Sequence, residues 1–183
     1  MLPTDNVYGT WAASGEIDIM EARGQVPNQV SSTIHYGGVW PNNQYTTSGD
    51  MTFGVDFTAD YHIFALDWNS SALNFYIDES LTYTQSLQRS FGSIYQNNGA
   101  PFDQKFHLLL NVAVAGGFFD ASRFGTFDIA TASPTWTQEF LIDYVRVYQW
   151  IDSTADPIPA TPAITGTPVT TSPPVSAPVA APS

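Results

Sequence analysis

Residues 15–22 constrain the fold of this chain most, because three carboxylates interrupt a run of strand-forming apolar residues. Glu16, Asp18 and Glu21 stand there among isoleucine and methionine. Successive side chains of a β-strand point to opposite faces, so Glu16 and Asp18 share a face and Glu21 has the opposite parity. A β-bulge near Ile19-Met20 would add one residue to the strand and return Glu21 to the shared face. We therefore predict a bulged strand that presents three acids on one side.

Three acids on one strand face are typical of a particular chemistry. Charged residues make up only 12% of the chain, and carboxylates this close repel one another, so one of them should hold its proton unusually tightly. Retaining glycoside hydrolysis needs such a pair, one carboxylate as nucleophile and one carboxylic acid as proton donor. The alternative is a solvated face of ordinary surface acids. Such acids usually alternate with Lys or Arg, and here Arg23 alone is near, so we favour the catalytic interpretation.

The spacing of the acids resembles the E-x-D-x-x-E signature of glycoside hydrolase family 16. Further blocks resemble the laminarinase-like β-1,3-glucanase branch of that family and occur in the same order, at residues 11–15, 33–37, 62–68, 74–78, 101–104, 108–117 and 142–148. The resemblance covers residues 1–150. It implies a concanavalin-like jelly-roll β-sandwich. It also implies that Glu16 is the nucleophile, that Glu21 is the acid/base, and that Asp18 tunes the pair.

Four further residues are candidates for substrate binding. In the family, the residue that resembles Trp11 stacks on sugar near the cleavage point, and the one that resembles His35 contacts substrate. Trp40 lies in a Gly/Pro/Asn loop and is a candidate platform for an outer sugar. Asn111 interrupts an apolar run, which indicates either a buried hydrogen-bonding role or a contact in the cleft.

No metal or cofactor is expected. Asp143 resembles a family position that helps to bind a structural calcium ion, but calcium takes six to eight oxygen ligands and a single aspartate supplies too few. The absence of cysteine removes disulfides and thiol chemistry from consideration.

The remaining pattern predicts an all-β fold. Apolar and polar residues alternate with a period of two in several segments, namely 29–36, 61–68, 73–79, 106–115 and 139–149. Turn-forming clusters separate them, and a helix is conceivable only at 86–95. Many short strands at regular spacing are typical of a β-sandwich.

Composition divides the chain near residue 150. Residues 153–183 hold eight of the 13 prolines, with Ser, Thr, Ala and Val between them and no aromatic residue. Such a stretch buries too little apolar surface to order itself. We predict a catalytic domain at 1–150 and a disordered linker or stalk at 151–183. Because the first residues resemble an internal part of the family pattern, we also expect the domain to lack N-terminal strands.

The net charge of the chain limits the classes of molecule that it can bind. A formal net charge of −12 disfavours nucleic acid and anionic membranes, whereas a neutral polysaccharide is compatible with it. The resemblance implies that this polysaccharide is a β-glucan, and we expect a monomeric protein. The first residues do not show the basic and then apolar pattern of a secretory signal, but the resemblance implies an extracellular or cell wall-associated protein.

The leading hypothesis is retaining endo-hydrolysis of a laminarin-type β-1,3-glucan. One alternative is a non-catalytic β-glucan-binding protein on the same scaffold, and another is an inactive truncated fragment. Mixed-linkage β-glucan is the alternative substrate. The presence of all three acids favours catalysis, because the binding relatives in the family typically lose one or both glutamates.

Overall fold

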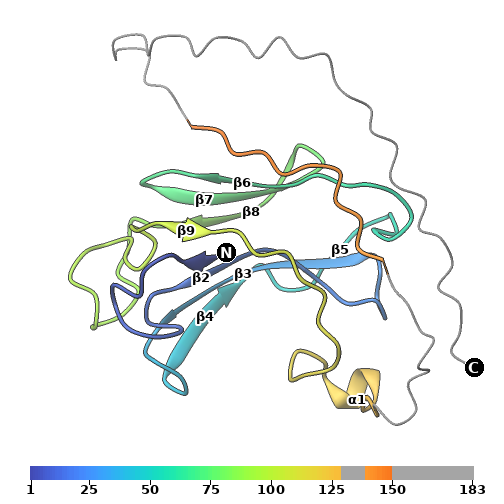
Figure 1. Cartoon of the computed structure of the whole chain (residues 1–183), viewed down its shortest axis with the longest axis horizontal. Coiled ribbons are helices and arrows are strands. Elements are labelled where there is room, and N and C mark those ends of the chain that lie inside the picture. The colour runs from blue at the N-terminus through green and yellow to red at the C-terminus, as the bar shows by residue number, and fades with distance from the viewer. Residues whose placement is uncertain (129–138, 150–183) are drawn as a thin grey trace, which may run out of the picture. The chain divides into compact units, whose positions relative to one another are not determined.

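The computed structural model describes residues 1–128 and 139–149 and places nine strands and one short helix in them (Figure 1). All strand pairs are antiparallel, which confirms the β class predicted from the sequence. The largest sheet has β3 at its centre, with β2 on one side and both β4 and β5 on the other. Its strands are β2 (Glu16–Ala22), β3 (Gln29–Gly37), β4 (Asn43–Thr47) and β5 (Met51–Thr52).

A second sheet is a three-stranded meander of β6 (Phe64–Trp68), β7 (Ala72–Ile77) and β8 (Ser80–Ser86). A third sheet pairs β1 (Leu2–Pro3) with β9 (Phe106–His107). The helix α1 (Ala121–Phe124) follows Asp120, whose side chain accepts a hydrogen bond from the backbone N–H of Ser122. An aspartate at this position caps a helix because it satisfies a free N–H group of the first turn.

The bulge in β2 lies where the sequence predicts it. Asp18 pairs with Thr33 and Glu21 pairs with Ser31, so Ile19 and Met20 together face one residue of β3. That residue is Ser32, whose hydroxyl donates a 2.9 Å hydrogen bond to the carbonyl of Ile19. A carbonyl released from the ladder by the bulge thus keeps a partner, and the bulge prediction is confirmed.

The core lies on the other face of the sheet from the acids. Ile17 and Ile34 are paired across β2 and β3 and are fully buried. They pack in one cluster with Leu73 and Phe75 of β7, whose alternate side chains are buried in the same way. The segment between β8 and β9 adds further buried residues to this cluster, namely Leu87, Phe91, Tyr95, Ala100 and Phe102. The two larger sheets therefore share one apolar core.

Several predicted elements differ from the structure. Within the described residues, the strand predicted at 106–115 pairs at Phe106–His107 alone, where β1 supplies the two partners Leu2 and Pro3. Its apolar residues beyond His107 are exposed, with 40% exposure at Leu108 and 64% at Val112. The described residues 139–149 contain no strand, and 86–95 contains no helix, because Ser86 ends β8 and residues 87–95 are irregular. The strands β4 and β8 were not predicted, because their sequences are too polar to show an apolar alternation.

Residues 1–143 form one compact unit and residues 144–183 belong to a second. Of the second unit the structure describes 144–149, where the guanidinium of Arg146 lies 4.0 Å from the ring centre of Tyr144. The predicted linker at 151–183 lies outside the described residues. Within the described part of the chain, no helix has the length and apolar character needed to cross a membrane.

Candidate active site

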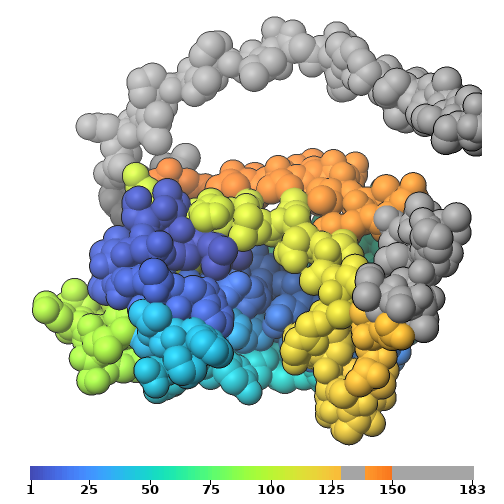
Figure 2. Space-filling view, turned by 60° about the horizontal axis from the view of Figure 1, so that its bottom comes forward, coloured from blue at the N-terminus to red at the C-terminus, as the bar shows by residue number. Residues whose placement is uncertain are grey.

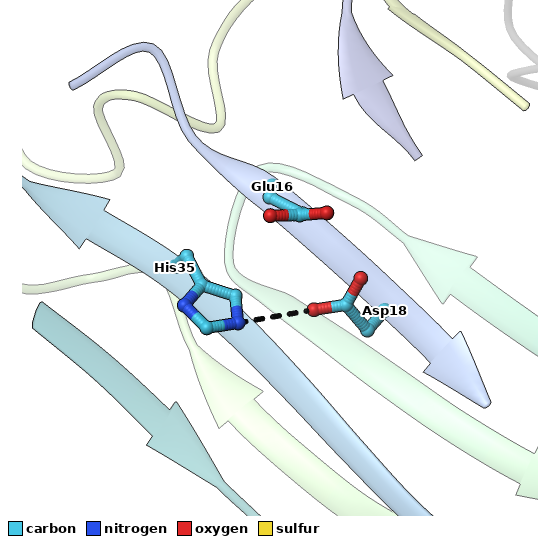
Figure 3. Close-up of side chains that lie close together, drawn as sticks. All are labelled: Glu16, Asp18 and His35. Carbon is cyan, nitrogen blue, oxygen red and sulfur yellow. Dashed lines mark ion pairs between the residues drawn. The ribbon is translucent and has the colours of Figure 1, made fainter. Parts of the chain in front are cut away.

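The three acids lie on one face of the sheet, as predicted. The register pairs Glu16 with His35, Asp18 with Thr33 and Glu21 with Ser31, and these three β3 residues have the same parity. Figure 3 shows Glu16 and Asp18 leaving β2 on the side to which His35 points. A line of polar side chains therefore follows the strand, directly opposite the buried isoleucines.

Glu16 lies at the start of this line and is partly buried. The indole Nε1–H of Trp11 donates a hydrogen bond of 2.5 Å to its Oε2 atom. Burial raises the pKa of Glu16 and the neighbouring charge of Asp18 adds to the rise, while the Trp11 hydrogen bond and the charge of His35 oppose it. Trp11 thus stabilises the ionised form of this carboxyl group.

Asp18 and His35 face each other across β2 and β3. Nε2 of His35 lies 3.4 Å from Oδ2 of Asp18 (dashed line in Figure 3). Burial lowers the pKa of the His35 imidazole, but the carboxylates of Asp18, Glu16 and Glu21 outweigh burial and raise it overall. A protonated imidazole would therefore balance part of the negative charge that the three acids bring together.

The carboxyl group of Glu21 accepts a hydrogen bond from a side chain of β3. The hydroxyl of Thr33 donates a 2.8 Å hydrogen bond to Oε2 of Glu21 and lies 3.2 Å from the hydroxyl of Thr47 on β4. Burial raises the pKa of Glu21, and the charges of Asp18 and Glu16 raise it further, whereas the Thr33 hydrogen bond lowers it. Glu21 is thus the acid whose proton the other carboxylates help to retain.

Replacing Thr33 by Val should raise the pKa of the Glu21 carboxyl group. Valine matches the shape of threonine but removes the hydroxyl that stabilises the ionised carboxylate, so the protonated form should persist to higher pH. The chain contains four glutamates, so titration of ¹³C-carboxyl-labelled Glu by NMR can resolve Glu21. Thr47→Val is the matched control and should shift the Glu21 titration less. An unchanged or lowered pKa in Thr33→Val would contradict the role given to this hydrogen bond.

The predicted substrate-binding residues have different surroundings. The Trp11 ring lies 5.6 Å from that of His35 and is 39% exposed, so both residues lie beside Glu16. Trp40 is 68% exposed, as predicted for its loop, and its backbone N–H donates to the carbonyl of Trp11. Asn111 lies in the exposed segment that follows β9. Its buried alternative is therefore wrong, and its contact in the cleft stays a prediction.

The sequence did not predict the contacts of two side chains on the acid-bearing face, namely Thr33 and Tyr45. The hydrogen bond from Thr33 to Glu21 crosses the bulge, so it depends on a strand register that the sequence does not supply. Tyr45 was missed entirely, although it pairs with His35 across β3 and β4 and their rings lie 5.8 Å apart. The residues around Tyr45 are polar and show no apolar alternation, so the sequence does not predict a strand there. Without a predicted strand, the side of the sheet to which Tyr45 points cannot be predicted either.

In the described part of the chain, the only candidate metal ligands that lie together belong to the acid-bearing face. Among the described residues, one set of three suitable side chains has its ligand atoms within 4.8 Å of one another, namely Glu16, Asp18 and His35. Asp143 is exposed and does not belong to this set. Three ligands fall short of the six to eight oxygens of a calcium site, and a metal bound here would occupy the carboxylates of Glu16 and Asp18.

Two glutamates on either side of an aspartate, on one face of a bulged strand, are the arrangement expected of a glycoside hydrolase. Residues 4–133 match the family described as Glycosyl hydrolases family 16, and the chain belongs to this family. The family expected from the sequence is thereby confirmed.

Three relatives illustrate what the chain is similar to. It is 47% identical over 152 residues to glucan endo-1,3-beta-glucosidase A1 of Niallia circulans, covering 81% of this chain and 21% of that protein. It is 40% identical over 152 residues to glucan endo-1,3-beta-glucosidase of Cryptopygus antarcticus, covering 82% and 55%. It is also 40% identical over 141 residues to a beta-1,3-glucan-binding protein of Penaeus monodon, covering 65% and 38%. The chain thus spans between 21% and 55% of the length of these relatives.

Proposed function

We propose that this chain carries the site for retaining endo-hydrolysis of β-1,3-glucan, with Glu16 as nucleophile and Glu21 as acid/base. The observation that carries the proposal is the bulge at Ile19-Met20, which brings Glu21 to the face of Glu16 and Asp18. Without the bulge, Glu21 would lie on the core face with Ile17. The bulge is thus a structural irregularity whose effect is to gather the acids.

The proposed reaction begins with attack of the Glu16 carboxylate on the anomeric carbon. The glycosidic C–O bond breaks, and Glu21 gives its proton to the leaving oxygen. Water then attacks the glycosyl-enzyme bond while Glu21 accepts a proton from it, and Glu16 is released as a carboxylate. A sugar hydroxyl in place of water would give transglycosylation by the same steps.

The surroundings of the two glutamates support this division of roles. Trp11 donates a hydrogen bond to Glu16, which favours the ionised form needed for attack. Burial raises the pKa of Glu21 most, and the charges of Asp18 and then Glu16 raise it further, which favours the protonated form needed for donation. Asp18 shares the face of both glutamates, and after burial its charge is the main cause that raises the pKa of each.

The substrate proposed is a laminarin-type β-1,3-glucan. The names of the Niallia circulans and Cryptopygus antarcticus relatives support it, and the charge of −12 disfavours sulfated polymers. Mixed-linkage β-glucan is the alternative substrate. We also propose that the two facing sheets are parts of a jelly-roll sandwich, that residues 1–150 are the catalytic unit, and that the protein works as an extracellular or cell wall-associated monomer.

A non-catalytic glucan-binding role is the second candidate, and the name of the Penaeus monodon relative favours it. The presence of both Glu16 and Glu21 argues for catalysis instead. The test incubates the chain with laminarin and measures new reducing ends, with retention in laminarin-containing gels as a separate measure of binding. Release of sugar whose first-formed anomer is β by proton NMR supports retaining hydrolysis. Retention in the gel without any reducing ends would support the binding role and overturn the proposed activity.

A further inference from the structure

One exposed aromatic side chain on the acid-bearing face has no role in the reaction described above. Tyr45 on β4 is 63% exposed and pairs with His35 on β3, which in turn pairs with Glu16 on β2. These three residues form one line across the sheet, perpendicular to the strands. In Figure 2 the cyan residues, which include those of β4, lie at the surface of the molecule.

Neighbouring aromatic rings contact one another along this line. The Trp11 and His35 rings lie 5.6 Å apart and the His35 and Tyr45 rings 5.8 Å apart, with interplanar angles of 45° and 42°. The rings of Trp11, His35 and Tyr45 therefore form a row with similar tilts between neighbours, and the row extends from Glu16 to β4. Beyond its contact with His35, the Tyr45 side chain stays 63% exposed. This exposed side chain is thus accessible to a ligand.

Aromatic rings bind sugars because their flat apolar faces match the C–H faces of a pyranose ring, while a tyrosine hydroxyl can also donate to a sugar oxygen. Neighbouring strands lie about 4.8 Å apart, so Tyr45 is about 10 Å from the catalytic strand across the sheet. That distance exceeds the reach of the acids. A ring on β4 therefore contacts a sugar that is not itself cleaved.

We propose that Tyr45 is a substrate-positioning residue, which stacks on a glucose unit away from the scissile bond and makes the glucan lie across β2, β3 and β4. The proposal rests on the proposed function, since it deepens the description of the same site. It predicts a preference for longer chains. An oligosaccharide that reaches Tyr45 gains binding from it, whereas a shorter one does not.

The test compares Tyr45→Ala with Tyr45→Phe and with Tyr61→Ala. Tyr61 is a matched control, because it is 62% exposed and precedes β6 rather than lying on the acid-bearing sheet. KM and kcat are measured on β-1,3-gluco-oligosaccharides of increasing length. Binding of the same oligosaccharides to the Glu16→Gln variant, with and without each change, is measured by calorimetry.

Tyr45→Ala should raise KM and the dissociation constant of long oligosaccharides about 3- to 10-fold and leave kcat and short oligosaccharides unchanged. Tyr45→Phe should restore most of the loss, because it keeps the ring. Equal affinity of Tyr45→Ala and the unchanged protein for every length would overturn this inference while leaving hydrolysis intact. Binding that depends on Tyr45 in a chain that never cleaves laminarin would overturn the proposed function alone. A chain that neither binds nor cleaves would overturn both.

Discussion

Replacing Glu16 by Gln should reduce the turnover of β-1,3-glucan by about four orders of magnitude, equivalent to about 5.5 kcal/mol in the activation barrier. Glutamine keeps the size of the side chain and can still face Trp11, but an amide oxygen is a poor nucleophile and no glycosyl-enzyme can form. The measurement is the initial rate of reducing-end release from laminarin. Binding of laminarin should change little, so the loss should fall on kcat.

The matched control is Glu79→Gln. Glu79 is exposed in the turn between β7 and β8, so the same chemical change occurs away from the acid-bearing face. This variant should retain the full rate. A more specific control uses Glu16→Ala with added azide, a small anion that can attack the anomeric carbon from the side that Glu16 occupies. An azide product of inverted configuration would identify Glu16 as the nucleophile, and a Glu16→Gln variant with a rate within tenfold of the original would disprove that role.

Replacing Phe75 by Ala should destabilise the fold by about 3–5 kcal/mol. Phe75 is 1% exposed, lies in the cluster that joins the two larger sheets, and stacks on Tyr83 at 5.6 Å between ring centres. Truncation removes this apolar contact and leaves a cavity that the neighbouring strands can close only in part. Small domains are stable by about 5–15 kcal/mol in total, so the loss would be a large part of the whole.

Denaturant unfolding followed by circular dichroism measures this effect. The control is Leu81→Ala on the adjacent strand β8, where the side chain is 56% exposed and the loss should stay within about 0.5 kcal/mol. Comparable losses in the two variants would show that the cluster around Phe75 does not hold the sheets together. A loss below about 1 kcal/mol in Phe75→Ala would lead to the same conclusion.

The sequence predicts best those strands whose two faces differ sharply. Residues 15–22 place acids on one face and isoleucine on the other, so parity alone predicts the strand and its bulge. The strand at 29–36 and the hairpin of β6 and β7 follow from the same contrast. The predicted strand at 106–115 is wrong beyond His107, because an apolar alternation describes what a segment could bury and not whether a partner strand pairs with it.

The candidate active site, like the fold, can be predicted from the sequence only in part. The shared face of Glu16, Asp18 and Glu21 follows from spacing within one strand. The partners that give each acid a different environment come from elsewhere, since Thr33 reaches Glu21 through the pairing of β2 with β3. Tyr45 needs a second pairing, of β3 with β4, in a strand whose sequence is largely polar. Local spacing therefore predicts which groups do the chemistry, and strand register decides what surrounds them.

The bulge at Ile19-Met20 also changes how this strand responds to a change in length. In an ordinary strand, deleting one residue reverses the facing of everything that follows. Here a chain without Met20 would keep Glu21 opposite Ser31 and Ala22 opposite Val30, because Ile19 and Met20 together occupy the single position opposite Ser32. A one-residue deletion at this position would therefore make the strand regular and leave Glu21 on the face of Glu16 and Asp18, whereas a deletion at Asp18 or before it would not remove the bulge.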